Sequence, residues 1–216
     1  MGMRELEISD QNLTIYELDD VYDAVTGHTC TGSWIWDSAL FLSQWLVTSS
    51  FDLQAKFVLE LGAGLGLPGL MAAKLGANRV MLTDVAQLLH GLRKNVDVNG
   101  LENRVEAREI VWGFSEGSRT DGELGKFDVV LMSDVFYDMA ETTALGRTLK
   151  RVCGGETMVL AASEIRCWSG ECLGGLVSQG FEVVELPSHV ECECDALVGG
   201  GGVDKFAIYR LIPPTK

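Results

Sequence analysis

Apolar residues along the chain follow two patterns that alternate. Short runs that are almost entirely apolar occupy residues 57–61, 79–84, 127–133 and 157–163. After each run comes a longer stretch in which apolar residues recur every three or four positions, or in which proline and glycine mark the ends of a helix. The short runs are typical of parallel strands buried on both faces, and the longer stretches are typical of helices.

Four further segments extend this alternation. We expect a helix over Asp37–Thr48 and strands over 104–110, 181–186 and 205–211. Strands that alternate with helices at this spacing predict an α/β fold, in which helices cover both faces of a parallel sheet. Ligands of such folds bind at the carboxyl ends of the strands, so the chemistry should lie just after the first, second and fourth strands.

The composition indicates one domain. The chain has 216 residues, 47% of them apolar, and no charged or Pro/Ser-rich linker divides it. We therefore expect a single domain over 1–216, with 1–30 as an N-terminal extension and 188–204 as a glycine-rich insert before the last strand. The N-terminus has no apolar segment typical of a secretion signal, and no run is long enough to span a membrane. We expect a cytoplasmic protein, with the nucleus as a second location.

Charge and cysteine content restrict the partners. The net charge of −14 argues against nucleic acid, because phosphate binding needs clustered Lys and Arg. A basic or neutral protein substrate fits this charge better, although acidity that serves only solubility explains it equally well. We expect the six cysteines to be reduced and to bind no metal, since even Cys192 and Cys194 in VECECD lack a second pair of ligands.

The turn after the first strand reads ELGAGLG. Its glycines, Gly62, Gly64 and Gly66, occur at every second position, whereas a dinucleotide fingerprint would need its third glycine at Leu67. Free N–H groups of the helix that follows favour a carboxylate, as in a methionine moiety. Glu60 can accept a hydrogen bond from an ammonium but would repel a pyrophosphate, so the turn favours a zwitterionic amino-acid ligand.

Asp84 ends the second strand, 22 positions after Gly62. A carboxylate at this point can accept hydrogen bonds from both hydroxyls of a ribose. The alternative is that Asp84 only caps the following helix, and the two roles are compatible.

Four blocks of sequence together resemble a known family. They are TGSWIWDSA (31–39), the glycine turn within VLELGAGLGLPG, VWG (111–113) and DVFY (134–137). In this order they resemble the seven-β-strand methyltransferases, specifically the protein-lysine methyltransferase-like family 16. The resemblance implies a Rossmann-like seven-stranded methyltransferase sheet, mostly parallel with an antiparallel C-terminal strand, and S-adenosyl-L-methionine as the cofactor.

The resemblance also assigns residues to the cofactor site. The family's pattern implies that Trp36 lies against the cofactor, that Trp112 flanks the adenine and that Ser133 lines the pocket. Aromatic neighbours suit a flat purine and a sulfonium, although each tryptophan could instead simply fill the core. With the turn residues, the expected cofactor-binding set is Trp36, Glu60, Gly62, Ala63, Gly64, Asp84, Trp112 and Ser133.

Asp134 and Tyr137 match the D-x-x-Y motif that this family uses at its substrate site. Asp134 could there orient an incoming amine by a hydrogen bond and Tyr137 could pack on the stem of a lysine, although Asp134 could instead only cap or stabilise the loop. We therefore expect a monomeric enzyme that methylates a lysine of a non-histone protein. The alternatives are a small-molecule N-methyltransferase, a histidine or arginine acceptor, and a scaffold that binds the cofactor without catalysis.

Overall fold

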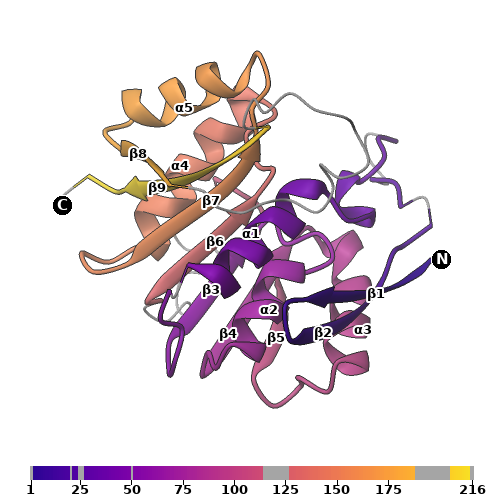
Figure 1. Ribbon diagram of the computed structural model, residues 1–216. Helices are drawn as coiled ribbons and strands as arrows, with labels where there is room; N and C mark the ends of the chain where they lie inside the picture. The colour runs from indigo at the N-terminus through magenta and orange to yellow at the C-terminus, as the bar shows by residue number, and fades with distance from the viewer. Residues whose placement is uncertain are drawn as a thin grey trace.

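The computed structural model describes residues 2–19, 21–23, 27–49, 51–113, 127–187 and 205–214. Its central sheet is built from β3 (Phe57–Leu61), β4 (Arg79–Asp84), β5 (Val105–Glu109), β6 (Val129–Ser133), β7 (Met158–Glu164), β8 (Glu182–Leu186) and β9 (Phe206–Ile212). The strands lie in the order β5-β4-β3-β6-β7-β9-β8 (Figure 1). Neighbours from β5 to β7 are parallel, while β9 runs antiparallel to both β7 and β8. The predicted fold class is confirmed.

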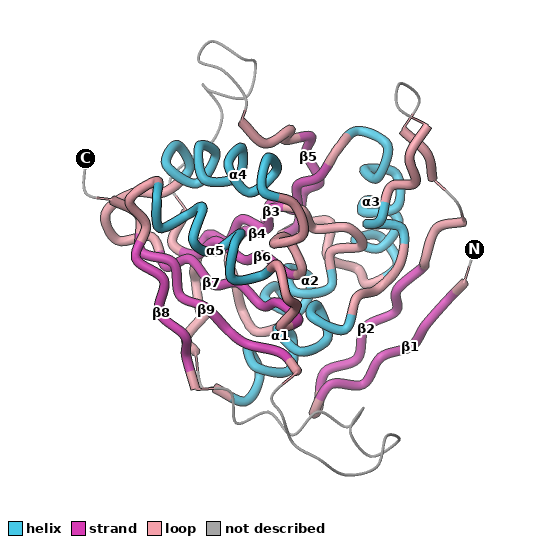
Figure 2. Tube along the Cα trace, turned by 90° about the horizontal axis from the view of Figure 1, so that it is seen from above, coloured by secondary structure: helices cyan, strands magenta, loops and turns pink. Residues whose placement is uncertain are grey.

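Helices cover both faces of the sheet (Figure 2). One face packs against α1 (Asp37–Thr48), α2 (Leu67–Lys74) and α3 (Leu89–Val98), and the other against α4 (Met139–Val152) and α5 (Ser169–Ser178). Two short 3₁₀ turns, η1 (Thr31–Ser33) and η2 (Ala86–Leu88), precede α1 and α3. The strands β3, β4 and β6 are buried on both sides, which explains their almost unbroken apolar runs.

The N-terminal extension contains a β-hairpin that the sequence patterns did not predict. It consists of β1 (Met3–Ile8) and β2 (Gln11–Tyr16), which pair antiparallel, with Leu13 and Ile15 buried in the core. Asn95 of α3 and Asn99, which follows the helix, hold the hairpin, since Asn95 accepts from the N–H of Tyr16 at 2.8 Å and Asn99 from that of Thr14 at 2.9 Å. These asparagines therefore join the C-terminal end of α3 to β2.

We expect Asn95→Ala to lower the free energy of unfolding by about 1–3 kcal/mol, because it leaves buried backbone groups without partners. Asn95 is fully buried and also donates to the carbonyls of Leu65 and Tyr16, at 3.1 and 3.3 Å. Urea denaturation followed by tryptophan fluorescence measures the change. Asp97→Ala, at an exposed position of the same helix, is the matched control; equal effects of the two variants would contradict this account.

Some expectations concern residues outside the described ranges. These are the polar loop near residues 115–125, the glycine-rich insert 188–204, and Cys192 and Cys194. The four described cysteines, Cys30, Cys153, Cys167 and Cys172, form no disulfide within the described ranges.

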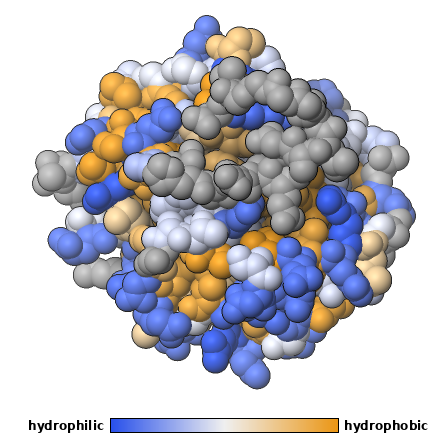
Figure 3. Space-filling model, in the orientation of Figure 1, coloured by the Kyte–Doolittle hydropathy of each residue, from blue (hydrophilic) through white to orange (hydrophobic). Residues whose placement is uncertain are grey.

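None of the helices in the described ranges is long and apolar enough to cross a membrane. Hydrophilic side chains are scattered across the face drawn in Figure 3.

Candidate active site

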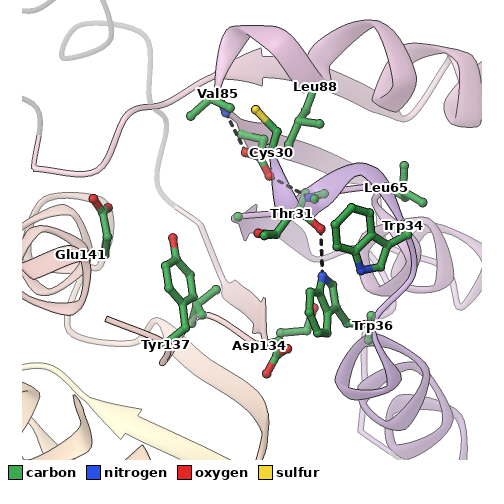
Figure 4. A pocket seen from close by; sticks show the side chains of 18 of the residues that line it. Cys30, Thr31, Trp34, Trp36, Leu65, Val85, Leu88, Asp134, Tyr137 and Glu141 are labelled. Atoms are coloured by element: carbon green, nitrogen blue, oxygen red, sulfur yellow. Dashed lines mark hydrogen bonds between the residues drawn. The ribbon is translucent and has the colours of Figure 1, made fainter. Parts of the chain in front are cut away.

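A cavity of about 480 Å³ lies at the carboxyl ends of β3, β4, β5 and β6. Each of these strands continues into a loop that lines it, and the segment before α1 forms a further wall (Figure 4). The parallel strands bring these loops to one edge of the sheet, as the sequence predicted. The cavity is therefore built from segments that are far apart in the sequence.

The glycine turn is shaped by close backbone contact. Gly62 and Gly64 have φ angles of +63° and +55°, which residues with side chains rarely adopt. A Cβ on Gly64 would lie only 3.2 Å from the carbonyl oxygen of Gly32, so the segment before α1 rests directly on the turn. The N–H of Ala63 donates to the carbonyl of Thr83 at 2.9 Å and fixes the turn against β4. Gly62, Ala63 and Gly64 all line the cavity.

Asp84 joins the glycine turn to the end of β4. Its Oδ2 accepts from the N–H of Gly64 at 2.7 Å and its Oδ1 from the N–H of Val85 at 2.8 Å. Burial raises the pKa of Asp84, and these two hydrogen bonds oppose the shift. Its contacts are not those of a helix cap, because Val85 is the cap of η2 and that cap has no side-chain hydrogen bond. The carboxylate instead stands at the cavity wall, where its remaining lone pairs can accept from hydroxyl groups.

Glu60 is placed differently from the expectation. Its side chain is fully buried and faces α2, where Oε2 accepts from the N–H of Gly69 at 2.9 Å. The other oxygen, Oε1, has no hydrogen-bond partner within the described part of the chain. Burial raises the pKa of Glu60 to about 8. Since Glu60 does not line the cavity, the structure does not place it to meet a ligand's ammonium there, and it joins β3 to α2 instead.

We expect Glu60→Gln to stabilise the protein at neutral pH. In the folded state Glu60 keeps its proton up to a pKa of about 8, whereas its ordinary value is 4.5. The folded state then binds more protons than the unfolded state between these values, so this residue lowers stability as pH rises through that window. Glutamine cannot ionise, so urea denaturation should show little gain at pH 4.5 and a gain of about 4 kcal/mol at pH 7.5. A gain independent of pH would contradict this assignment.

Two of the predicted tryptophans line the cavity. The indole N–H of Trp36 donates to the carbonyl of Thr31 at 2.9 Å, which orients the ring, and Trp34 lies beside it at 5.8 Å between ring centroids. Trp112 packs on the glycine turn, because a Cβ on Gly62 would lie 2.8 Å from its ring. Neither Trp36 nor Trp112 is fully buried. Both are available to a flat ligand and do not act only as core residues.

The segment after β6 carries the residues of the predicted substrate site. Ser133 and Asp134 line the cavity, and Asp134 has a φ of +55°, an uncommon value outside glycine. Tyr137 stands on the opposite side of Asp134 from Trp36 (Figure 4). Partial burial raises the pKa of Tyr137 to about 12, with added contributions from the charges of Glu141, Asp84 and Asp138. Its hydroxyl therefore stays protonated at neutral pH and can donate a hydrogen bond.

Arg166 is a residue of this site that the sequence analysis missed. Its Nη2 donates to Oδ2 of Asp134 at 3.1 Å, and its Nε donates to Glu164 at 2.9 Å. Burial raises the pKa of Asp134, while the positive charge of Arg166 opposes that shift. A smaller cavity of about 210 Å³, lined by Arg166, lies beside the first. Asp134 and Trp36 each line both cavities. Arg166 follows β7, the parallel neighbour of β6, so its position after a predicted strand could have indicated that it lies at the same edge of the sheet as Asp134.

The cavity walls fit the expected cofactor in three respects. Glycines without side chains shape the turn, the carboxylate of Asp84 can accept from hydroxyls, and aromatic rings offer faces to a purine. The walls suit an uncharged ribose with a flat base attached.

Comparisons with known proteins agree with this geometry. Residues 20–172 match the family model described as lysine methyltransferase. Protein N-lysine methyltransferase METTL21A of Danio rerio is 36% identical over 164 residues, which cover 74% of this chain and 72% of that protein. EEF1A lysine methyltransferase 3 of Xenopus tropicalis is 32% identical over 133 residues, covering 61% of this chain and 57% of that protein. The protein N-terminal and lysine N-methyltransferase EFM7 of Cryptococcus neoformans is 36% identical, and this chain spans 44% of its length.

Solved structures share the fold at low sequence identity. The ribosomal protein L11 methylase of Lactobacillus delbrueckii subsp. bulgaricus superposes with a TM-score of 0.61 at 14% identity, covering 98% of this chain and 99% of that one. The glycopeptide N-methyltransferase MtfA, in complex with (S)-adenosyl-L-methionine, superposes with a TM-score of 0.60 at 14% identity, covering 80% and 87%. At these identities the structural likeness is evidence for the fold alone.

Proposed function

Because this chain belongs to the lysine methyltransferase family, we propose that it methylates a lysine side chain of a non-histone protein. It is an S-adenosylmethionine-dependent methyltransferase, and the resemblance found in the sequence is confirmed. One observation carries the proposal for the site. Asp134 and Tyr137, the candidate substrate residues, line the same cavity as Asp84 and the glycine turn.

When bound, S-adenosylmethionine supplies an electrophilic methyl group on a sulfonium. The residues that would hold the cofactor are those of the cavity wall. Asp84 accepts from the ribose hydroxyls, Gly62 and Gly64 keep the wall free of side chains, and Trp112 offers a flat apolar surface to the adenine. Trp36 offers a ring face that attracts a positively charged group.

The chain must also prepare the acceptor. A lysine has an ordinary pKa of about 10.4, so it is protonated at neutral pH and must lose its proton before it can attack. Asp134 orients the amine by accepting a hydrogen bond, and Tyr137 packs on the lysine stem with a hydroxyl that remains protonated. The proton leaves to solvent, and most of the rate acceleration comes from positioning.

Exposed side chains at the mouth of the cavity support a protein substrate. Tyr137 is 49% exposed and Trp34 is 36% exposed, so the site is open to a surface lysine of a large molecule. Glu141 lines the mouth, and the chain carries a net charge of −14. These charges favour a basic segment around the acceptor lysine and oppose nucleic acid. We place the enzyme in the cytoplasm, with the nucleus as a second location, and expect it to act as a monomer.

Incubation of the purified protein with radiolabelled S-adenosylmethionine and a soluble host lysate tests this function. The expected result is label on a discrete protein band, with methyllysine identified there by mass spectrometry and no label when Asp134→Ala replaces the wild type. If calorimetry shows cofactor binding but no protein is labelled, the protein substrate is wrong and a small molecule or a non-catalytic role replaces it. Size-exclusion chromatography checks the monomer.

A further inference from the structure

Four charged side chains form a chain of contacts beside the acceptor site. Arg166 bridges the carboxylates of Asp134 and Glu164, at 3.1 and 2.9 Å, and Lys205 reaches Glu164 at 3.4 Å. Their formal charges, two negative and two positive, sum to zero. Only Asp134 of the four lines the larger cavity. The carboxylate of Asp134 therefore faces the acceptor site, and the positive charge of Arg166, which does not line the larger cavity, offsets its negative charge.

This balance matters because the reaction needs a neutral amine. A carboxylate within about 4–6 Å of an amine favours the ammonium and raises its pKa by roughly 1–3 units. An unbalanced Asp134 would therefore bind the substrate lysine well but hold it in the form that cannot attack. A carboxylate already paired with a guanidinium can still accept a hydrogen bond while attracting a proton far less.

We propose that Arg166 is a positioning residue that neutralises Asp134, so that Asp134 orients the acceptor lysine without trapping it as an ammonium. This inference rests on the proposed function. Arg166 does not touch the reacting atoms; it acts through Asp134.

The surroundings of Arg166 fix its guanidinium in this position. The Arg166 side chain is 19% exposed and lies over the rings of Trp36 and Trp168, at 5.6 and 5.9 Å from their centroids. Glu164 holds it from the end of β7 through Nε and Nη2. Asp134 is itself held, because its N–H donates to the carbonyl of Ala162 at 2.9 Å. Both partners of the pair are thus constrained by backbone and ring contacts, and the pairing does not depend on two mobile side chains.

Other charged and titratable groups around the acceptor position do not provide this neutralisation. Tyr137 stays uncharged at working pH, because burial and nearby acids raise its pKa to about 12. The remaining neighbours from α4, β4 and the start of α1 are acids, namely Glu141, Asp138, Asp84 and Asp37. Lys205 is paired with Glu164 and lies within 4.0 Å of Asp37. Within the described ranges, Arg166 is the cation in direct contact with Asp134.

Two cofactor analogues test the proposal without a protein substrate. In sinefungin a carbon that bears an amino group replaces the sulfur and its methyl group, whereas S-adenosylhomocysteine has an uncharged thioether there. Calorimetry of both ligands between pH 6.5 and 9.5 gives the ratio of their Kd values, in which contributions from the shared ribose, adenine and amino-acid parts cancel. The ratio reports how strongly the site favours an ammonium close to Asp134.

We expect Arg166→Ala to favour sinefungin over S-adenosylhomocysteine about tenfold more than the wild type does, which corresponds to about one pKa unit for the bound amine. Arg166→Lys keeps the charge and should stay within about threefold of the wild type, while Glu164→Gln removes a negative charge and should shift the ratio the other way. Thermal denaturation confirms that each variant is folded.

The proposal is overturned if the ratio is unchanged in Arg166→Ala, or if Arg166→Lys changes it as much, since packing rather than charge would then be responsible. Neither result would bear on the lysate labelling, which tests the proposed function. Label on a protein together with an unchanged ratio would leave the methyltransferase assignment intact and remove only the role of Arg166.

Discussion

Replacing Asp84 with asparagine is expected to weaken S-adenosylmethionine binding about 1,000-fold, because two charge-assisted hydrogen bonds to backbone N–H groups and the acceptor for the ribose are changed together. The carboxylate accepts from Gly64 and Val85 through different oxygens. An asparagine has one acceptor oxygen, so one of these N–H groups would face an NH₂ group. The substitution therefore disturbs both the ligand contact and the glycine turn. Isothermal titration calorimetry measures the affinity directly.

A matched variant separates the loss of cofactor affinity in Asp84→Asn from any effect of removing one negative charge elsewhere on the protein. Asp97→Asn makes the same chemical change at an exposed position near the end of α3. We expect its cofactor affinity to stay within about twofold of the wild type, since an exposed charge this far from the cavity is screened. Circular dichroism should show both variants folded. If Asp84→Asn binds as tightly as Asp97→Asn, the cavity at the ends of β3 and β4 is not the cofactor site.

The elements that position the cofactor site could be predicted because their signals are local. FVLEL and RVMLTD are continuous apolar runs, and both became central strands with the predicted bounds, β3 and β4. Once two such strands are parallel and adjacent, the residues that follow them must lie at the same edge of the sheet. This is why Asp84 and Gly64, 20 positions apart, are in contact.

The position of Glu60 follows from the alternation of side chains along β3. Side chains alternate between the faces of a strand, so Glu60 shares a face with Val58, and that face packs against α2. An acid at the end of a strand favoured a ligand contact for Glu60. The alternation of side chains along β3 instead places Glu60 under α2, away from the cavity.

The remaining differences depend on contacts between distant parts of the chain. The hairpin is held by Asn95 and Asn99, which are 79 and 85 positions from their partners in β2. The pair of Asp134 and Arg166 spans 32 positions, and it forms because β6 and β7 are adjacent and parallel. No local pattern specifies a partner at such separations. The pair of Asp134 and Arg166 becomes visible only when the order of the strands is known, and the contacts of the hairpin only when its position beside α3 is known.

Replacing Asp134 with asparagine is expected to lower the initial rate of lysine methylation about 100- to 1,000-fold, because a misplaced acceptor loses most of the benefit of positioning. The affinity for S-adenosylhomocysteine, which carries no positive charge at sulfur, should stay within about twofold, since Asp84 and the glycine turn keep their contacts. Asparagine tolerates the φ of +55° at this position about as well as aspartate does, so the variant changes chemistry with little change of backbone.

The substitution Asp134→Ala provides the contrast. Alanine does not tolerate the left-handed backbone region, so this variant should also lose about 1–2 kcal/mol of stability, which Asp134→Asn should not. Rates are measured as label incorporated into the protein band found in the lysate, with Asp97→Asn as the control for the loss of a carboxylate. Methylation by Asp134→Asn at the control's rate would show that Asp134 does not orient the amine. The structure would then assign that task to Tyr137, the other residue of the motif that lines the cavity.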